Sequence, residues 1–180
     1  MSQIIFISGS PTATSRTDIV LKHVDSLVKQ EGLSTTTYSV TDFSPEDLVK
    51  GRYNSEDIVK FANLIKEADG VVIGSPVYKA SYTGVLKSLM DLLPEGALKN
   101  KPVLPIMVGG STRHLLAIDY SLNPLIAILR GQPLQGLYFV DSEIDKTNEV
   151  APIKDIELIE RLQNQVNEFV EAVERAKSAK

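Results

Sequence analysis

Short apolar runs alternate with longer segments of helical periodicity along the chain. The apolar runs predict five buried strands, at residues 4–7, 33–40, 71–73, 103–108 and 134–140. Apolar residues spaced three or four apart predict helices at 18–31, 55–68, 83–93, 114–130 and 152–176, with a further helix start at Ser44. Strands that alternate with helices indicate a parallel sheet with helices on both faces. We therefore expect an α/β doubly wound fold with a five-stranded parallel sheet, in a single domain over residues 1–180.

Composition narrows the classes of function. The chain has 180 residues, and 43% of them are apolar, which is enough for a sizeable core. The formal charge of −4 disfavours nonspecific binding of nucleic acid. The absence of cysteine excludes disulfides and thiolate sites, and two histidines leave little for a metal site. With no basic leader and no apolar segment of about 18 residues, we expect a cytoplasmic protein without a membrane span.

Three of the predicted strands end in loops of small residues. These loops begin with the sequences Ser8-Gly9-Ser10-Pro11, Gly74-Ser75-Pro76-Val77-Tyr78 and Gly109-Gly110-Ser111. In open parallel sheets the ligand binds beyond the carboxyl ends of the strands, where the strand order reverses. The three loops are therefore predicted to meet at one edge and to form one concave site.

The first loop has the features of a phosphate site. It leads into a helix N-terminus and carries five Ser and Thr hydroxyls between Ser10 and Thr17. Its candidate phosphate ligands are Ser10, Ser15, Arg16 and Thr17. The alternative is an ordinary strand-to-helix loop in which Ser15 or Thr17 caps the helix. The loop matches neither the triphosphate-binding P-loop nor the Gly-x-Gly-x-x-Gly fingerprint of dinucleotide-binding folds.

The other two loops favour a flat ring. Pro76, Val77, Tyr78 and Lys79 offer an apolar wall and backbone donors to a heteroaromatic ligand. The alternative is that Tyr78 and Tyr82 are surface or interface aromatics. Gly109, Gly110 and Ser111 permit close backbone approach to a ligand, whereas a plain turn is the alternative.

Pro124 lies inside the apolar helical segment 114–130. Because proline donates no backbone hydrogen bond, we expect a kink or a π-bulge near residues 119–121. Nearly every position from 115 to 129 is apolar, so this helix is expected to be covered on more than one side. A subunit contact would cover it, and the alternative is coverage within one chain. His114 is expected to cap or pack near the helix start.

Several of these segments together resemble the flavodoxin-like NADPH-dependent FMN reductases, most of all the reductases of two-component alkanesulfonate monooxygenase systems. The resemblance extends over roughly residues 3–140 and is carried by Ser8–Pro11 with Ser15-Arg16, Asp69-Gly70, Pro76–Lys87, Asp91–Pro94, Val103–Pro105, Gly109–Ser111 and His114–Tyr120. One departure is Thr12, where the family often has Arg.

The resemblance implies a flavodoxin-like fold and two ligands, FMN and NADPH. FMN would place its phosphate on the first loop, its ring against Pro76–Lys79 and its pyrimidine edge near Gly109–Ser111. Tyr120 resembles the tyrosine of a π-helix that the family associates with tetramers and with flavin as a releasable substrate. A homodimer or homotetramer through the helix around Tyr120 is therefore expected.

The sequence thus predicts an NAD(P)H-dependent FMN reductase that passes a hydride from NADPH to FMN and supplies reduced flavin to a partner monooxygenase. No side chain is expected to act as acid or base, because the two ligands carry the chemistry, and no metal is expected. Two alternatives stay open. One is a quinone or azo reductase with bound FMN, and the other is a non-enzymatic electron carrier of the flavodoxin type or an interaction protein.

Overall fold

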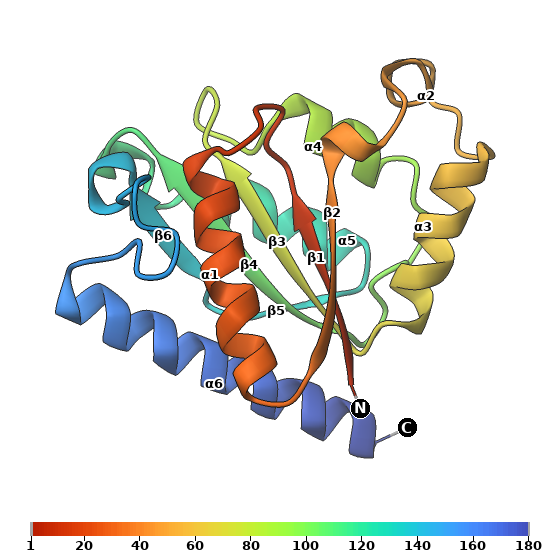
Figure 1. Ribbon diagram of the computed structural model, residues 1–180. Coiled ribbons are helices and arrows are strands. Elements are labelled where there is room, and N and C mark those ends of the chain that lie inside the picture. The colour runs from red at the N-terminus through yellow and green to blue at the C-terminus, as the bar shows by residue number, and fades with distance from the viewer. Residues whose placement is uncertain (1, 180) are drawn as a thin grey trace.

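A parallel sheet forms the centre of the structure, a computed structural model that describes residues 2–179 (Figure 1). Its strands are β1 (Gln3–Ser8), β2 (Ser34–Ser39), β3 (Gly70–Pro76), β4 (Pro102–Gly109), β5 (Gln132–Pro133) and β6 (Leu137–Val140). The strand order is β2-β1-β3-β4-β5, and β6 also pairs with β4. The chain runs outward from β1 to β2 and then crosses back to β3, so the order reverses between β1 and β3. This reversal is where the fold rule places a ligand.

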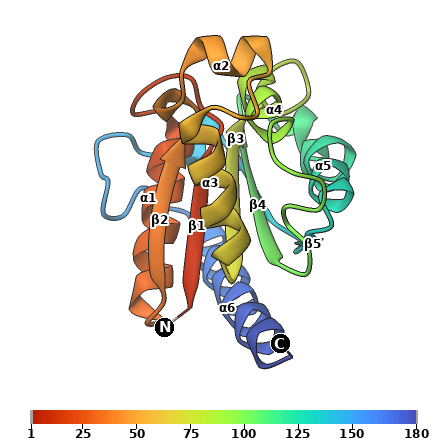
Figure 2. The same ribbon diagram turned by 90° about the vertical axis from the view of Figure 1, so that its right-hand side faces the viewer.

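Helices cover both faces of the sheet. They are α1 (Arg16–Gln30), α2 (Pro45–Lys50), α3 (Glu56–Glu67), α4 (Gly84–Met90), α5 (Asn123–Ile128) and α6 (Ile156–Ser178). Figure 2 shows α1 and α5 on opposite sides of the strands. Neighbouring side chains of β1 point into different cores: Ile4 and Phe6 pack with α1 and α6, whereas Ile5 and Ile7 pack with α3, α4 and α5. The predicted doubly wound sheet is confirmed.

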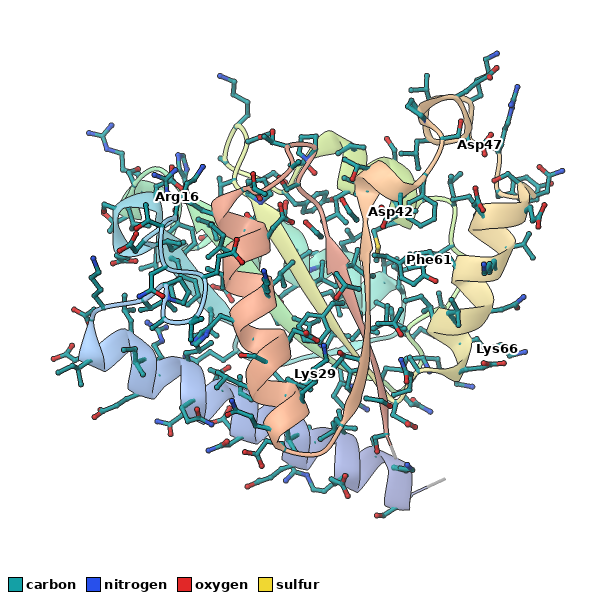
Figure 3. The ribbon with its side chains drawn as sticks, in the orientation of Figure 1. Arg16, Lys29, Asp42, Asp47, Phe61 and Lys66 are labelled. Atoms are coloured by element: carbon teal, nitrogen blue, oxygen red, sulfur yellow. The ribbon has the colours of Figure 1, made fainter. Side chains whose placement is uncertain are left out.

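The edge strand β2 is rich in Thr and has no fully buried residue. An aromatic cluster fixes it to α3. The ring of Phe61 lies 5.0 Å from that of Tyr38 and 5.1 Å from that of Phe43, both with edge-to-face geometry. Figure 3 shows Phe61 reaching from α3 toward β2. The ring contacts with α3 therefore help to hold β2 in the sheet, although the residues of β2 are half-buried or exposed.

The predicted fifth strand, residues 134–140, is wrong in one respect: only Leu137–Val140 (β6) is strand, residues 134–136 are not, and the pairing with β4 begins earlier, at β5. Pro105 of β4 lies opposite the break and has no N–H for the ladder. Gly136 has a φ of 80°, and a Cβ on it would lie 2.5 Å from the Pro105 carbonyl oxygen. Its amide instead donates to Gln165 Oε1 of α6 at 3.1 Å. The outer edge of the sheet is thus two short strands separated by a bend.

The apolar segment 114–130 is not one continuous helix. A 3₁₀ turn at Thr112–His114 comes first, a π-helix spans Ile118–Leu122, and α5 follows. The predicted π-bulge near residues 119–121 is confirmed. Asn123 N–H donates to the carbonyl of Ile118, five residues earlier, and Pro124 has no N–H to continue the α pattern. The expectation of regular helix from His114 onward is wrong, because the first turn belongs to the loop after β4.

Candidate ligand-binding site

The three loops lie side by side at the carboxyl edge of the sheet, which is the upper edge in Figure 1. We call them the first loop (residues 9–17, which includes the start of α1), the second loop (76–83) and the third loop (109–117). Gly9 N donates to Gly74 O at 2.7 Å, and Thr83 Oγ1 donates to Gly9 O at 2.6 Å. Val77 N donates to Val108 O at 2.8 Å. These bonds join the first loop to the second and the second loop to the end of β4.

Two hydroxyls of the first loop are already used within the protein. Ser15 caps α1, since its Oγ accepts from Asp18 N at 3.2 Å and donates to Asp18 Oδ2 at 2.7 Å. Ser10 Oγ accepts from Thr12 N at 3.2 Å and donates to Thr12 O at 3.1 Å. The alternative interpretation of Ser15 as a helix cap therefore describes this structure, and both serines stabilise the shape of the loop.

Arg16 and Thr17, in contrast, have unused donors. Thr17 is 1% exposed, and its Oγ1 has no hydrogen-bond partner within residues 2–179. Arg16 Nε is also buried and unpartnered in the same range. The backbone amides of both residues lie in the first turn of α1, where no intrahelical acceptor exists. Figure 3 shows Arg16 at the upper end of α1, so these donors are located at the edge where the loops meet.

The second loop is a tight hairpin. Tyr78 N donates to Ser81 O at 2.8 Å, and Ser81 N donates to Tyr78 O at 3.2 Å. The two residues between them have positive φ, 51° at Lys79 and 66° at Ala80. Positive φ at both central residues is typical of a type I′ turn, in which Asn and Gly are usual. This strained turn leaves Tyr78 47% exposed, beside the half-buried Pro76 and Val77.

Tyr138 of β6 holds the third loop in place. Its hydroxyl donates to Ser111 O at 2.6 Å. A Cβ on Gly109 would lie 2.2 Å from that hydroxyl, so only glycine fits at this position. Burial raises the pKa of Tyr138, and the carboxylates of Asp141 and Glu143 raise it further, so the hydroxyl stays protonated as a donor. Sequence reasoning missed Tyr138, because nothing in β6 marks which side chain faces the loop.

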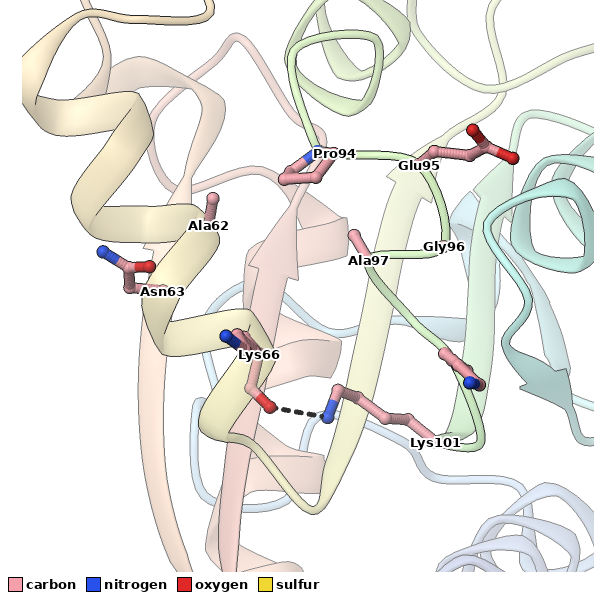
Figure 4. A pocket seen from close by; sticks show the side chains of 9 residues that line it. Ala62, Asn63, Lys66, Pro94, Glu95, Gly96, Ala97 and Lys101 are labelled. Atoms are coloured by element: carbon pink, nitrogen blue, oxygen red, sulfur yellow. Dashed lines mark hydrogen bonds between the residues drawn. The ribbon is translucent and has the colours of Figure 1, made fainter.

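Two cavities differ in their relation to this edge. A groove of about 380 Å³ runs between the second and third loops and is lined by Ala80, Thr112, Arg113, His114, Leu115, Leu116, Ala117 and Tyr120. A pocket of about 490 Å³ lies at the opposite, amino edge (Figure 4). There, buried Lys101 donates from Nζ to Lys66 O at 3.0 Å and to Ala68 O at 2.7 Å, and so caps the end of α3. That second pocket is explained by helix capping and lies away from the site.

The three loops carry groups that can bind a ligand. Within residues 2–179, no group of three or more His, Asp and Glu side chains could hold a metal ion. The three loops bring together a helix N-terminus with unused donors, an exposed aromatic ring and a glycine-bearing loop. Such a set suits a planar ligand that carries a phosphate.

Comparison with known proteins identifies related sequences and a related structure. A family model described as NADPH-dependent FMN reductase matches residues 2–146. An FMN reductase (NADPH) of Pseudomonas putida is 39% identical over 174 residues, which cover 96% of this chain and 88% of that protein. An FMN reductase (NADPH) of Escherichia coli is 41% identical over 145 residues, covering 79% and 75%. The apo crystal structure of an NADH:FMN oxidoreductase superposes with a TM-score of 0.84 at 30% identity, covering 94% of this chain and 88% of the other.

Proposed function

The chain belongs to the family of NADPH-dependent FMN reductases and so reduces FMN with NAD(P)H, and we propose that the three loops form the site where this occurs. The observation that carries this placement is the set of buried, unpartnered donors on Arg16 and Thr17. Other buried side-chain atoms of the described residues also lack partners, but these two donors lie on adjacent residues at the start of α1, where a ligand phosphate would satisfy both.

The residues present fit FMN in two parts. At the first loop, the amides of Arg16 and Thr17, the Thr17 hydroxyl and the Arg16 guanidinium would hold the phosphate. Ser10 and Ser15 would form the frame of that cradle rather than its leading donors, since their hydroxyls are bonded within the loop. Asp18 accepts three hydrogen bonds from serines, which turns its charge toward the protein.

The ring of FMN would lie along the second and third loops. Pro76, Val77, Tyr78 and Lys79 would form its wall, and Gly109, Gly110 and Ser111 would meet its pyrimidine edge. Gly110 is exposed, and a Cβ on it would meet only Asp141 Oδ2, at 4.0 Å, so a ring atom can come close to its backbone. We assign no catalytic side chain.

The chemistry that the bound ligands supply is transfer of a hydride from nicotinamide C4 to flavin N5. The role of the protein in this reaction is to hold the two rings in contact and to exclude water. The hairpin of the second loop is suited to this task, because its paired hydrogen bonds fix Tyr78 beside the ring position.

The proposal extends to the fate of the product: reduced FMN leaves and serves a partner monooxygenase, and the protein acts in the cytoplasm as one domain. The test is anaerobic oxidation of NADPH with and without added free FMN. We expect a rate that saturates with free FMN. A quinone or azo dye reduced by protein-held flavin, with no need for free FMN, would favour the rival reductase. Tight FMN binding with negligible NADPH oxidation would favour an electron carrier.

We also propose that the protein is a homodimer or homotetramer. An exposed apolar patch, Leu115, Leu116, Tyr120 and Ile128, lies on the π-helix and its flanks, with Tyr120 78% and Ile128 74% exposed. Tyr120→Ser is expected to shift the sedimentation coefficient toward that of a monomer, because it removes the largest side chain of the patch. Tyr53→Ser is the matched control, since Tyr53 is 71% exposed on α2's flank. Equal sedimentation of both variants would contradict the assignment.

A further inference from the structure

Each of the three loops supplies a cation, and none of these cations is neutralised. Arg16, Lys79 and Arg113 form no ion pair within residues 2–179, whereas Arg52, Arg130 and Arg175 each have a carboxylate partner. The chain as a whole carries a net charge of −4, so three free positive charges at one edge are not a consequence of a basic surface. Together they make this edge attractive to anions.

Arg113 has a fixed backbone and a free side chain. It lies in the 3₁₀ turn Thr112–His114, where its amide donates to Ser111 Oγ at 3.4 Å and Leu115 N donates to Thr112 O at 3.1 Å. Its side chain is exposed and lines the groove of about 380 Å³. Asp141 approaches Gly110 of the same loop but forms no ion pair with Arg113. The turn thus fixes the Arg113 backbone at the groove, and its guanidinium is available to a ligand.

The opposite wall of the groove is the tip of the second loop. Ala80 lines it, and Lys79 directly precedes Ala80 in the strained turn. Arg113 of the third loop therefore lines the groove, and Lys79 is the sequence neighbour of the residue that forms its other wall, both outside the Arg16 cradle. Leu115, Leu116 and Tyr120 of the apolar patch line the same groove, so the proposed subunit contact would lie directly beside Arg113.

We propose that Arg113, facing the Lys79–Ala80 turn, binds a phosphate group of the nicotinamide dinucleotide. This inference rests on the proposed function. FMN brings one phosphate, which the Arg16 and Thr17 donors of the first loop satisfy. The hydride donor brings a pyrophosphate and, in NADPH, a 2′-phosphate as well, and these need separate cations. A guanidinium binds a phosphate through two parallel hydrogen bonds, which gives orientation as well as affinity.

The test is the steady-state kinetics of Arg113→Gln at saturating FMN, with NADPH and with NADH as donor. Loss of a charge-assisted contact is expected to raise KM for the donor about tenfold, with a smaller effect on kcat. A rise with NADPH alone identifies the 2′-phosphate, and a rise with both donors identifies the pyrophosphate. Arg113→Lys keeps the positive charge but cannot form two parallel hydrogen bonds, so its KM for the donor is expected to lie between those of wild type and Arg113→Gln. KM values within twofold of wild type for both donors would overturn the proposal.

Arg161→Gln is the matched control, because Arg161 is an exposed arginine of α6 with no ion pair among the described residues. It changes the net charge equally and is expected to leave both KM values unchanged. A binding readout separates this inference from the proposed function: 2′,5′-ADP, which carries both a 2′- and a 5′-phosphate, should compete with NADPH in wild type and should compete less well in Arg113→Gln. A wild type that does not oxidise NADPH with FMN refutes the proposed function, whereas an active wild type and an unchanged Arg113→Gln refute only the role of Arg113.

Discussion

At the scale of single residues, the hydroxyls of the first loop are of two kinds: some form hydrogen bonds within the protein, and others have no partner and could bind a ligand. The Ser10 hydroxyl forms its hydrogen bonds within the loop, and the Ser15 hydroxyl forms its hydrogen bonds with Asp18 at the start of α1. Thr17, two residues past the cap, keeps a buried hydroxyl without a partner. Side chains of nearly the same chemistry thus have opposite thermodynamic roles, because removing a satisfied hydroxyl costs stability and removing an unsatisfied one does not.

This difference predicts the behaviour of Thr17→Val. The substitution keeps the shape of the side chain and removes an unpaired buried hydroxyl, so the free energy of unfolding should stay the same or rise by about 1 kcal/mol. Affinity for FMN should fall about tenfold, because a phosphate contact is lost. Urea unfolding and flavin fluorescence titration measure the two effects. Ser15→Ala is the comparison variant and should lower stability by about 1 kcal/mol through loss of the cap. If Thr17→Val binds FMN as tightly as wild type, then Thr17 does not contact the phosphate.

The sequence identified the three loops but not how their atoms are used. Spacing and residue type showed that Ser10–Thr17 surrounds a helix start, which is local information. Which hydroxyls are bonded within the loop depends on its closed conformation, as for Ser10 and Thr12. The contact of Tyr138 with Ser111 joins residues that lie 27 positions apart, and no periodicity encodes it.

At the scale of elements, the type I′ hairpin of the second loop holds two non-glycine residues at positive φ. A left-handed conformation is costly for any residue with a Cβ, so Ala80→Gly should stabilise the protein by roughly 1 kcal/mol. Ala151→Gly is the control, since Ala151 is exposed and has negative φ, and this substitution should be destabilising. Urea denaturation of both variants tests the prediction. A loss of stability in Ala80→Gly would show that the turn is not strained.

Elements that follow local rules were predictable, and those set by long-range contacts were not. The π-helix was predictable from Pro124, because the lack of an N–H on proline affects the backbone hydrogen bonds within one helical turn. The division between β5 and β6 depends on Pro105 of a different strand, which sequence periodicity does not reveal. Residues 152–155, predicted as helix, are extended instead: Ile153 bridges Ile144, and Asp155 caps α6 by accepting from Leu158 N at 3.0 Å.

At the scale of the whole molecule, α1 is joined to the segment before α6. Lys22 pairs with Glu149, and the next residue, His23, has a buried Nδ1 without a hydrogen-bond partner within residues 2–179. Burial lowers the pKa of His23, so its neutral form is favoured in the folded state. The unfolded chain then binds more protons, and stability should fall as the pH drops below the ordinary value near 6.5.

The measurement is the free energy of unfolding at pH 7.5 and pH 5.5 for wild type and for His23→Gln. Glutamine does not titrate in this range, so the variant should lose less stability than wild type on acidification. Carboxylates titrate equally in both proteins and cancel in the comparison. Equal losses would mean that the burial of His23 does not contribute to the pH dependence.

None of the helices within residues 2–179 combines the length and hydrophobicity that crossing a bilayer requires.

The hydrogen bonds from Gly9 to Gly74 and from Thr83 to Gly9 have a consequence for ligand exchange. They make the first two loops one preorganised frame before any ligand arrives. Since little chain entropy remains to be lost, binding energy is not spent on ordering the loops. At the proposed site a flavin would therefore enter and depart without ordering these two loops, and its residence time would follow from its direct contacts.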